Sequence, residues 1–452
     1  VDATDRRVDL PAPSDREGER ESEENSEEGD DDPESEERPS LEGALERAQR
    51  AVDERVGILS QVGERESFPI PYYVAATADT TGFSDARAAE FAGGADPDWD
   101  RAFMKALGEG LERYCAGVYR ADGFERAPAA SLRGQQEGRV VGPEEFVTPD
   151  DYGDGGDPER SRPWVRGTRL REAGDAGESA WLPAESVFYP PVERRFAPAI
   201  TTGLGLGNTA TEAVLSGLYE VIERDATMLA WYSTFEPLKL EFDGELTDLR
   251  KRARAESLTA TVLLVTQDVD VPVVAAAVHR DPSEFPDPVA EDADEWPAFA
   301  TGSGASLDPV AAARSALAEA LQNWTELRAM GPANAEEQGG AIGRYAGFPG
   351  EARAFVDAAA SVPAATLGEP ERSGRAELDA VLERIETVEL EAYAARTTTR
   401  DVAGLGFEGA RVVVPGAQPL FTGDPFFGDR ARTVPGTMGF EPHLDREYHP
   451  FP

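Results

Sequence analysis

The chain of 452 residues carries 87 acidic and 44 basic side chains, which give a formal net charge of −43. Because DNA, RNA and anionic membrane surfaces repel a chain of this charge, we expect neither a nucleic acid nor a membrane as its partner. The single cysteine, Cys115, excludes an intramolecular disulfide and a cysteine-based zinc site, and three scattered histidines argue against a His-rich metal site.

At the beginning of the chain, residues 14–40 contain almost no apolar side chain. Such a segment cannot bury enough surface to offset the entropy lost on ordering, so we predict that residues 1–40 are a disordered acidic segment. A solvated linker is its favoured role, and an acidic interaction tail is the alternative. Residues 41–452 are predicted to form the folded domain. The sequence begins with Val1 rather than Met, so an upstream piece could be missing.

Apolar periodicity and β-branched runs predict the elements of this domain. Helices are expected at residues 41–51, 101–120, 209–231, 309–328 and 377–397. Strands are expected at residues 164–170, 181–189, 261–266, 271–279 and 411–415. Helices that alternate with strands over this length indicate an α/β (α+β) fold.

Three of the helices share a local signature, in which a glutamate is followed three residues later by a second carboxylate or an amide. The pairs are Glu109 and Glu112, Glu220 and Glu223, and Glu319 and Gln322. The first residues of successive pairs are 111 and 99 residues apart, which is too long for a solenoid repeat. We therefore predict a pseudo-symmetric domain in which three equivalent helices meet.

The second of these helices concentrates its polar side chains on one face. At about 100° per residue, Glu212, Glu220 and Glu223 lie close together, with Asn208 beside them. The rest of the helix is apolar or small, so we predict that it is buried, and buried carboxylates without partners are costly. A divalent cation is the expected partner, and oxygen ligands favour magnesium, which also brings in phosphates. Simple solvation of the glutamate pairs is the alternative, and their recurrence on three apolar helices argues against it.

Two arginines, Arg113 and Arg224, directly follow the second glutamate of their pairs. Each is either an ion-pair partner of the glutamates or a contact to a triphosphate, and both interpretations stay open.

The glycine-rich residues 201–208 are interpreted as a loop that leads into the second helix. Backbone N–H groups of such a loop can bind a phosphate, or the glycines can simply allow close packing. The loop is not a P-loop, because it lacks Gly-Lys-Ser/Thr, and no clear strand precedes it as a dinucleotide-binding fold would require.

Together, these stretches resemble the signatures of YcaO proteins. Their central signature is similar to Gly203-Leu-Gly-Leu-Gly-Asn208-Thr-Ala-Thr-Glu212 followed by Glu220-Val-Ile-Glu223-Arg224. Their first ATP motif resembles Glu109-Gly-Leu-Glu112-Arg113-Tyr114, and their third resembles the turn Gly302-Ser-Gly-Ala305 with Arg314, Glu319 and Gln322. The ending His449-Pro450-Phe451-Pro452 is similar to the proline-spaced C-terminus of members that build azolines. The resemblance spans about residues 45–452.

The resemblance implies a YcaO-type fold with pseudo-symmetric helices around an ATP site that has no P-loop. It implies that five glutamates hold Mg²⁺ and phosphate oxygens: Glu109, Glu112, Glu212, Glu220 and Glu223. The implied cofactor-binding residues are Asn208, Arg224, Arg314, Glu319 and Gln322, to which we add Arg113. The tail residues His449 and Pro452 are expected in the active site. Two departures are that Gly93-Gly94-Ala95 lacks a lysine found in many relatives, and that Thr201 and Thr202 stand where serine is frequent.

The function implied by the resemblance is the ATP-dependent activation of backbone amides in a peptide or protein substrate. The product is an azoline if a Cys, Ser or Thr side chain of the substrate attacks the amide, and a thioamide if external sulfide attacks it. The alternative is a non-catalytic scaffold that presents a peptide to a partner enzyme. A separate peptide-recognition or sulfur-transfer partner is left open, and so is a homodimer.

The only lysines are Lys105, Lys239 and Lys251. Abundant carboxylate with scarce lysine suits a protein in molar salt, which screens self-repulsion to within a few ångströms, so we expect an extremely halophilic source. No apolar run approaches the ~20 residues of a membrane span, and no signal peptide is recognised, so the expected location is the cytoplasm.

Overall fold

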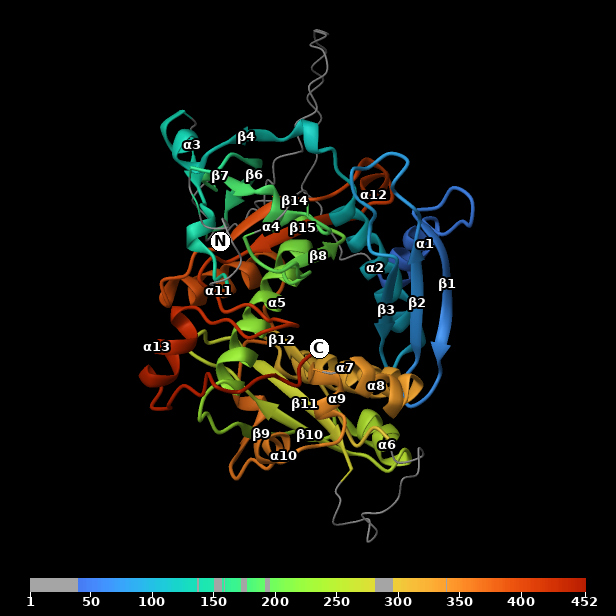
Figure 1. Cartoon of the computed structure of the whole chain (residues 1–452). Helices are drawn as coiled ribbons and strands as arrows, with labels where there is room; N and C mark the ends of the chain where they lie inside the picture. Colours follow the sequence, from blue (N-terminus) through green and yellow to red (C-terminus); the bar gives the residue numbers. More distant parts are fainter. Residues whose placement is uncertain are drawn as a thin grey trace, which may run out of the picture.

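Three sheets with helices packed on them surround the centre of the molecule (Figure 1). The computed structural model describes residues 40–135, 138–149, 157, 159–171, 177–191, 196–280, 296–338 and 340–452. The acidic segment predicted to be disordered lies outside the described residues, apart from Ser40, whose hydroxyl caps helix α1 (Leu41–Gln49). The mixture of helices and sheets confirms the predicted α/β (α+β) class.

In the described part of the chain, the sheets have three, seven and five strands. The first has the order β1-β2-β3 and consists of β1 (Leu59–Glu66), β2 (Tyr72–Thr77) and β3 (Phe91–Ala95). The second has the order β5-β7-β6-β14-β15-β8, with β4 paired to β6. Its strands are β4 (Glu125–Ala127), β5 (Arg139–Val140), β6 (Arg162–Arg169), β7 (Ser179–Pro183), β8 (Leu204–Gly207), β14 (Tyr393–Arg396) and β15 (Glu408–Val413). The third has the order β12-β11-β10-β9-β13 and consists of β9 (Leu238–Glu241), β10 (Thr259–Leu264), β11 (Val273–His279), β12 (Phe299–Ala305) and β13 (Ser361–Pro363).

A long helix packs on each sheet, next to a strand at its edge: α2 (Trp99–Gly117) on β3, α5 (Ala210–Trp231) on β8 and α7 (Pro309–Met330) on β12. Each helix begins after a side-chain cap. Asp98, Thr209 and Asp308 accept hydrogen bonds from backbone N–H groups of the first turn, as residues of this kind do at helix N-termini. The shorter helices are α3 (Ala129–Gln135), α4 (Ala184–Val187), α6 (Thr247–Ala255), α8 (Pro332–Gln338), α9 (Gly340–Tyr345), α10 (Gly350–Val356), α11 (Gly374–Thr387), α12 (Arg400–Gly404) and α13 (Asp429–Thr437).

Glycines on the three edge strands let the helices approach closely. A Cβ atom on Gly94 would lie 2.1 Å from the nitrogen of Ala106, one on Gly205 would lie 2.1 Å from the oxygen of Ala213, and one on Gly304 would lie 2.6 Å from the oxygen of Ala312. These are separations that real Cβ atoms do not adopt. The three glycines are spaced by the same 111 and 99 residues as the glutamate pairs, so the repeat includes the strands as well as the helices.

These glycines also explain why the strands were missed. Residues 201–208 were expected to form a loop and residues 302–305 a turn, whereas Leu204–Gly207 is strand β8 and residues 302–305 complete β12. Glycine disfavours a strand locally, but here packing of a helix backbone against the strand requires it. The structure shows the close packing that was one of the two roles expected of the glycine-rich segment, and phosphate binding stays a prediction.

Two other predicted elements need correction. The strand expected at residues 181–189 ends at Pro183, and helix α4 follows it. The helix expected at residues 377–397 ends at Thr387, and Tyr393–Arg396 forms β14 between β6 and β15. Alanines favour a helix there, but pairing on both sides in the sheet outweighs that preference.

Helix α5 is the most deeply packed of the long helices. Fourteen of its 22 residues are buried, which agrees with the burial expected from its apolar sequence. Trp231 at its end is fully buried and contacts the rings of Tyr345, Phe355 and Phe451. None of the helices in the described ranges is long and apolar enough to cross a membrane.

Candidate functional site

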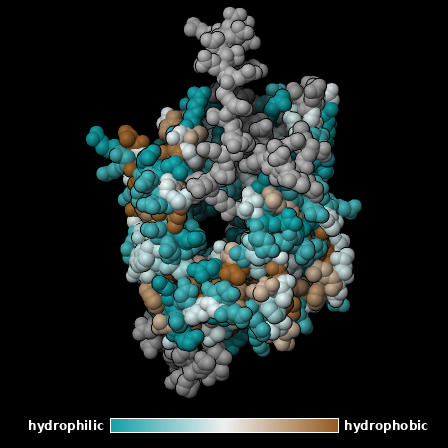
Figure 2. Space-filling model, turned by 180° about the vertical axis from the view of Figure 1, so that it is seen from behind, coloured by the Kyte–Doolittle hydropathy of each residue, from teal (hydrophilic) through white to brown (hydrophobic). Residues whose placement is uncertain are grey.

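A cavity of about 1000 Å³ lies where the three long helices meet. Residues of α2, α5 and α7 and of the edge strands β3, β8 and β12 line it, so each helix and its edge strand face the same space (Figure 1). Figure 2, which views the molecule from behind relative to Figure 1, shows a hollow near the middle of that face. The meeting of three equivalent helices that the repeat predicts is thus confirmed.

One hydrogen bond, from the backbone of an edge strand or the residue directly before it to a helix glutamate, recurs in all three units. The first glutamate of each pair accepts a backbone N–H: Glu109 from Gly93 at 2.9 Å, Glu220 from Gly203 at 2.9 Å, and Glu319 from Ser303 at 2.7 Å. A carboxylate that accepts a backbone N–H has a fixed position, so each bond holds a helix against its edge strand or the start of that strand. The pseudo-symmetry therefore extends to the hydrogen bonds of the site.

The arginines that follow the first two pairs fold back on those pairs. Nη2 of Arg113 lies 2.8 Å from Oε1 of Glu109, and Nη1 of Arg224 lies 3.5 Å from Oε1 of Glu223. Nη1 of Arg113 is buried and has no hydrogen-bond partner among the described residues. Both arginines form ion pairs and also line the cavity, so the phosphate contact stays a prediction.

Asn208 and Glu212 are engaged with each other at the start of α5. Oε2 of Glu212 accepts hydrogen bonds from the backbone N–H of Asn208 at 2.8 Å and from its side-chain amide at 2.9 Å. The amide oxygen of Asn208 accepts in turn from Arg47 on α1. These contacts fix the N-terminal turn of the helix, and both side chains line the cavity.

Ser303 on β12 joins the second unit to the third. Its hydroxyl donates to Oε1 of Glu223 at 2.6 Å, and its backbone N–H donates to Glu319. Sequence reasoning did not select Ser303. The signal that could have found it is a hydroxyl between the two glycines that pack against α7.

Burial acts strongly on the carboxylates deepest in the site. It raises the pKa of Glu112 to about 8, although neighbouring Arg113 opposes the rise. Burial also raises the pKa of Glu319 to about 7 and raises the pKa of Glu223, in both cases against the effect of Arg224. The cause is that the charged carboxylates lose their hydration, which a bound cation would compensate.

The charges that line the cavity favour a cation. Of its described lining residues, six are glutamates and three are basic, namely Lys105, Arg113 and Arg224. No group of three or more His, Cys, Asp or Glu side chains in the described ranges is arranged to hold a metal ion by itself. Mg²⁺ usually takes one or two carboxylates together with phosphate oxygens and water, so this arrangement fits a magnesium ion that arrives with a nucleotide.

The last residues of the sequence reach the cavity. Pro452 lines it, and the main-chain oxygen of Pro452 accepts a hydrogen bond from Nη1 of Arg224 at 2.8 Å. The chain before it is held by Trp231, whose indole N–H donates to the oxygen of Tyr448 at 2.8 Å, and by Thr301, whose hydroxyl donates to the oxygen of Pro450.

Two of the predicted site residues do not line the cavity. His449 is 4% exposed, its Nε2 lies 2.6 Å from the oxygen of Phe421, and burial lowers its pKa to about 4. Its ring packs among Tyr232 and other aromatic side chains beneath the tail. Arg314 points away from the cavity, since Nη1 donates to the oxygen of Glu245 at 3.0 Å and Nη2 lies 3.9 Å from Asp248. The other predicted residues all line the cavity.

Comparisons with known proteins agree with this geometry. The model of the family described as YcaO cyclodehydratase, ATP- and Mg²⁺-binding, matches residues 93–418. An uncharacterised protein of Methanothermobacter thermautotrophicus is 30% identical over 348 residues, which are 72% of this chain and 80% of that protein.

Two solved structures share the fold. A heterocyclase in complex with substrate and cofactor superposes with a TM-score of 0.75 and 20% identity, over 91% of this chain and 57% of the heterocyclase. YcaO from Methanopyrus kandleri, bound with AMPPCP and Mg²⁺, superposes with a TM-score of 0.60 and 23% identity, over 84% of this chain and 91% of that one. The chain therefore belongs to the YcaO family, whose cofactors are ATP and Mg²⁺.

Proposed function

We propose that this chain uses Mg–ATP to activate backbone amides of a peptide or protein substrate, giving an azoline or a thioamide. The observation that carries the proposal is the cavity in which three equivalent helices bring together six glutamates and two arginines. Membership in a family described as a cyclodehydratase supports the same reaction class.

Within this proposal, the metal and the phosphates lie among the paired carboxylates. The residues assigned to Mg²⁺ and phosphate oxygens are Glu109, Glu112, Glu212, Glu220 and Glu223, and those assigned to the nucleotide are Asn208, Arg113, Arg224, Glu319 and Gln322. Arg314 would have to leave Glu245 and Asp248 before it could reach the nucleotide.

Bound ATP supplies the γ-phosphoryl group that the amide oxygen accepts, so that this oxygen can leave as phosphate. The chain's own contribution is position and charge. Bonds from backbone N–H groups hold Glu109, Glu220 and Glu319 in place, and Arg113 and Arg224 offset negative charge that develops at the phosphates. Catalysis of this kind needs no nucleophilic side chain from the enzyme, because the substrate or sulfide supplies the nucleophile.

The tail is assigned to the substrate. Prolines at positions 450 and 452 fix φ and remove backbone donors, so the docked end is stiff and loses little entropy on binding. Pro452 at the cavity wall then positions the reacting amide, and buried His449 anchors the tail that carries Pro452.

The nucleophile decides the product, and a peptide-recognition or sulfur-transfer partner would supply what this chain lacks. A cytoplasmic location and a halophilic source belong to the same proposal and rest on composition. A homodimer is compatible with it.

The test compares cells that express this chain with cells that express the Glu223→Gln variant. Peptides from both are searched by mass spectrometry for loss of one water at Cys, Ser or Thr and for exchange of a backbone oxygen for sulfur. The proposal expects one of these changes in the first sample only. Identical samples from a chain that binds Mg–ATP would favour the scaffold function instead.

A further inference from the structure

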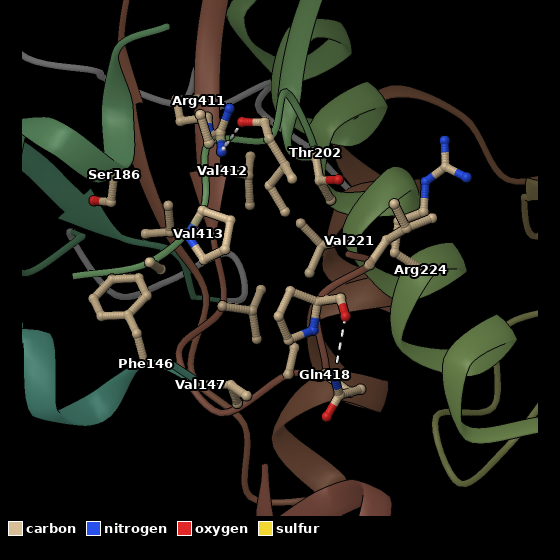
Figure 3. Close-up of a pocket in the computed structure, with 18 of the residues that line it drawn as sticks. Phe146, Val147, Ser186, Thr202, Val221, Arg224, Arg411, Val412, Val413 and Gln418 are labelled. Atoms are coloured by element: carbon tan, nitrogen blue, oxygen red, sulfur yellow. Dashed lines mark hydrogen bonds between the residues drawn. The ribbon is translucent and has the colours of Figure 1, made fainter. Parts of the chain in front are cut away.

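A second pocket of about 120 Å³ lies beside the cavity, between β15, helix α4 and residues 414–420. Six residues line both spaces: Tyr189, Ala199, Ile200, Thr202, Arg224 and Leu420. Figure 3 shows that the stem of Arg224 borders this pocket while its guanidinium points away from it. The pocket therefore adjoins the site where Arg224 meets Pro452.

The walls of this side pocket are mainly apolar. Phe146, Val221, Val412 and Val413 surround it in Figure 3. A similar volume, about 150 Å³ in an engineered apolar cavity, holds one benzene ring. The pocket is therefore large enough for a branched or aromatic side chain and too small for a whole nucleotide.

Two of the polar side chains that line the pocket, Ser186 and Arg411, already have partners. The hydroxyl of Ser186 donates to the oxygen of Pro183 at 2.8 Å, and the guanidinium of Arg411 donates to the oxygens of Ile200 and Thr201 at 3.2 and 3.0 Å. A nucleotide base needs donors and acceptors from the pocket wall, and these two side chains are already engaged, whereas an apolar side chain needs none.

Gln418 makes the pocket rigid. Its backbone N–H donates to Asp225 at 2.7 Å, its amide N–H donates to the oxygen of Phe426 at 3.0 Å, and its amide oxygen accepts from Gly428 at 2.9 Å. Arg430 also donates to both oxygens of Asp225. Because these bonds fix the wall, the pocket exists before anything binds, which lowers the entropy cost of filling it.

We propose that this pocket receives an apolar side chain, of about the size of leucine or phenylalanine, from the residue of the peptide substrate that neighbours the modified amide. The proposal rests on the proposed function, since it places the reacting amide in the adjoining cavity, near Arg224 and Pro452. It adds a preference for peptides with a bulky apolar residue beside the modified position.

N-acetyl-leucine methylamide and N-acetyl-serine methylamide serve as probes. Saturation-transfer NMR measures their binding to the chain at millimolar concentration. The chain is expected to bind the leucine probe and not the serine probe. Ala417→Trp fills the pocket and is expected to weaken the leucine probe at least tenfold. Ala359→Trp, at an exposed position outside the pocket, is the matched control and is expected to bind normally.

Val147→Ala is a second test that does not depend on the folding of Ala417→Trp. It should enlarge the pocket, so the affinity for the tryptophan analogue of the probe should rise relative to that for the leucine probe. Equal binding of both original probes, or a leucine probe unaffected by Ala417→Trp, overturns the proposal. If Ala417→Trp weakens the binding of adenosine and not of the leucine probe, the pocket binds the nucleotide and the proposal is overturned. Calorimetry with Mg–ATP on the same proteins separates the two proposals. Normal Mg–ATP binding without binding of the leucine probe overturns only the assignment of the pocket. Binding of the leucine probe without Mg–ATP binding overturns only the proposed function.

Discussion

Nη1 of Arg224 lies 2.8 Å from the main-chain oxygen of Pro452 and 3.5 Å from Oε1 of Glu223. One guanidinium thus joins the carboxylates of the cavity to the end of the tail.

Removal of residues 450–452 tests this connection. Because Pro452 is assigned to the substrate and the glutamates to the nucleotide, substrate modification should fall by orders of magnitude while Mg–ATP affinity stays within a few-fold. Thr301→Val is the milder companion, since it removes only the hydroxyl that donates to Pro450, a bond worth about 1 kcal/mol. Normal modification by the shortened chain would show that the tail has no such function.

Gly94→Ala tests whether strand glycines position the glutamates. The added Cβ would meet the backbone of Ala106, so α2 must move away from β3 and carry Glu109 and Glu112 with it. We expect a loss of about 1–3 kcal/mol in the free energy of unfolding, together with weaker Mg–ATP binding. Gly63→Ala is the matched control, because a Cβ at Gly63 on β1 of the same sheet meets nothing within 4 Å. Denaturant unfolding and calorimetry on both variants should separate them.

The carboxylate pairs and the three helices could be predicted because their signals are local: spacing along one helix face and apolar periodicity. The strands β3, β8 and β12 could not, because the reason for Gly94, Gly205 and Gly304 is a helix backbone that lies elsewhere in the sequence. Local preference then points to loops where packing produces strands.

The same distinction applies to individual side chains of the site. The spacing of Glu220 and Glu223 placed both in the cavity, but nothing in the sequence near Arg314 shows that Glu245 and Asp248 draw it away. Ser303 becomes visible only when β12 meets α5. His449 was selected by its position in the tail, and the structure places its ring in an aromatic cluster instead of the cavity.

Glu112→Gln tests the electrostatic cost of the site. Burial raises the pKa of Glu112 to about 8, so between the ordinary pKa near 4.5 and pH 8 the folded chain binds more protons than the unfolded chain. Stability contributed by this group is therefore lost as pH rises through that window. At pH 8–9 the free energy of unfolding of the variant should exceed that of the parent by on the order of 2 kcal/mol. The difference should vanish below pH 5.

The same variant should lose Mg–ATP binding, because a cation has one fewer carboxylate to meet. Glu42→Gln, on an exposed position of α1, should change neither property. A variant that is no more stable than the parent at high pH would mean that the parent carries no such cost at Glu112.

Substitution of Arg430 tests the ion pair that this side chain forms with Asp225 on α5. Its guanidinium contacts both oxygens of Asp225, at 2.9 and 2.7 Å, and both oxygens of Asp268, at 3.0 and 2.6 Å. Arg430→Ala leaves the buried carboxylate of Asp225 without its cation, so we expect a loss of about 3–5 kcal/mol in the free energy of unfolding. Adding Asp225→Asn should restore part of that loss, because it removes the unpaired charge. Urea unfolding of the single and double variants measures both effects, and additive losses would contradict this account.

The central claim is that the three helices form a binding site for Mg–ATP. Isothermal calorimetry with ATP, in high salt, with and without Mg²⁺, measures it directly on the parent chain and on Glu220→Gln. We predict saturable binding that requires Mg²⁺, disappears on chelation, and is lost in the variant while its fold is retained. Binding that is absent, or equally strong after chelation, would contradict the claim.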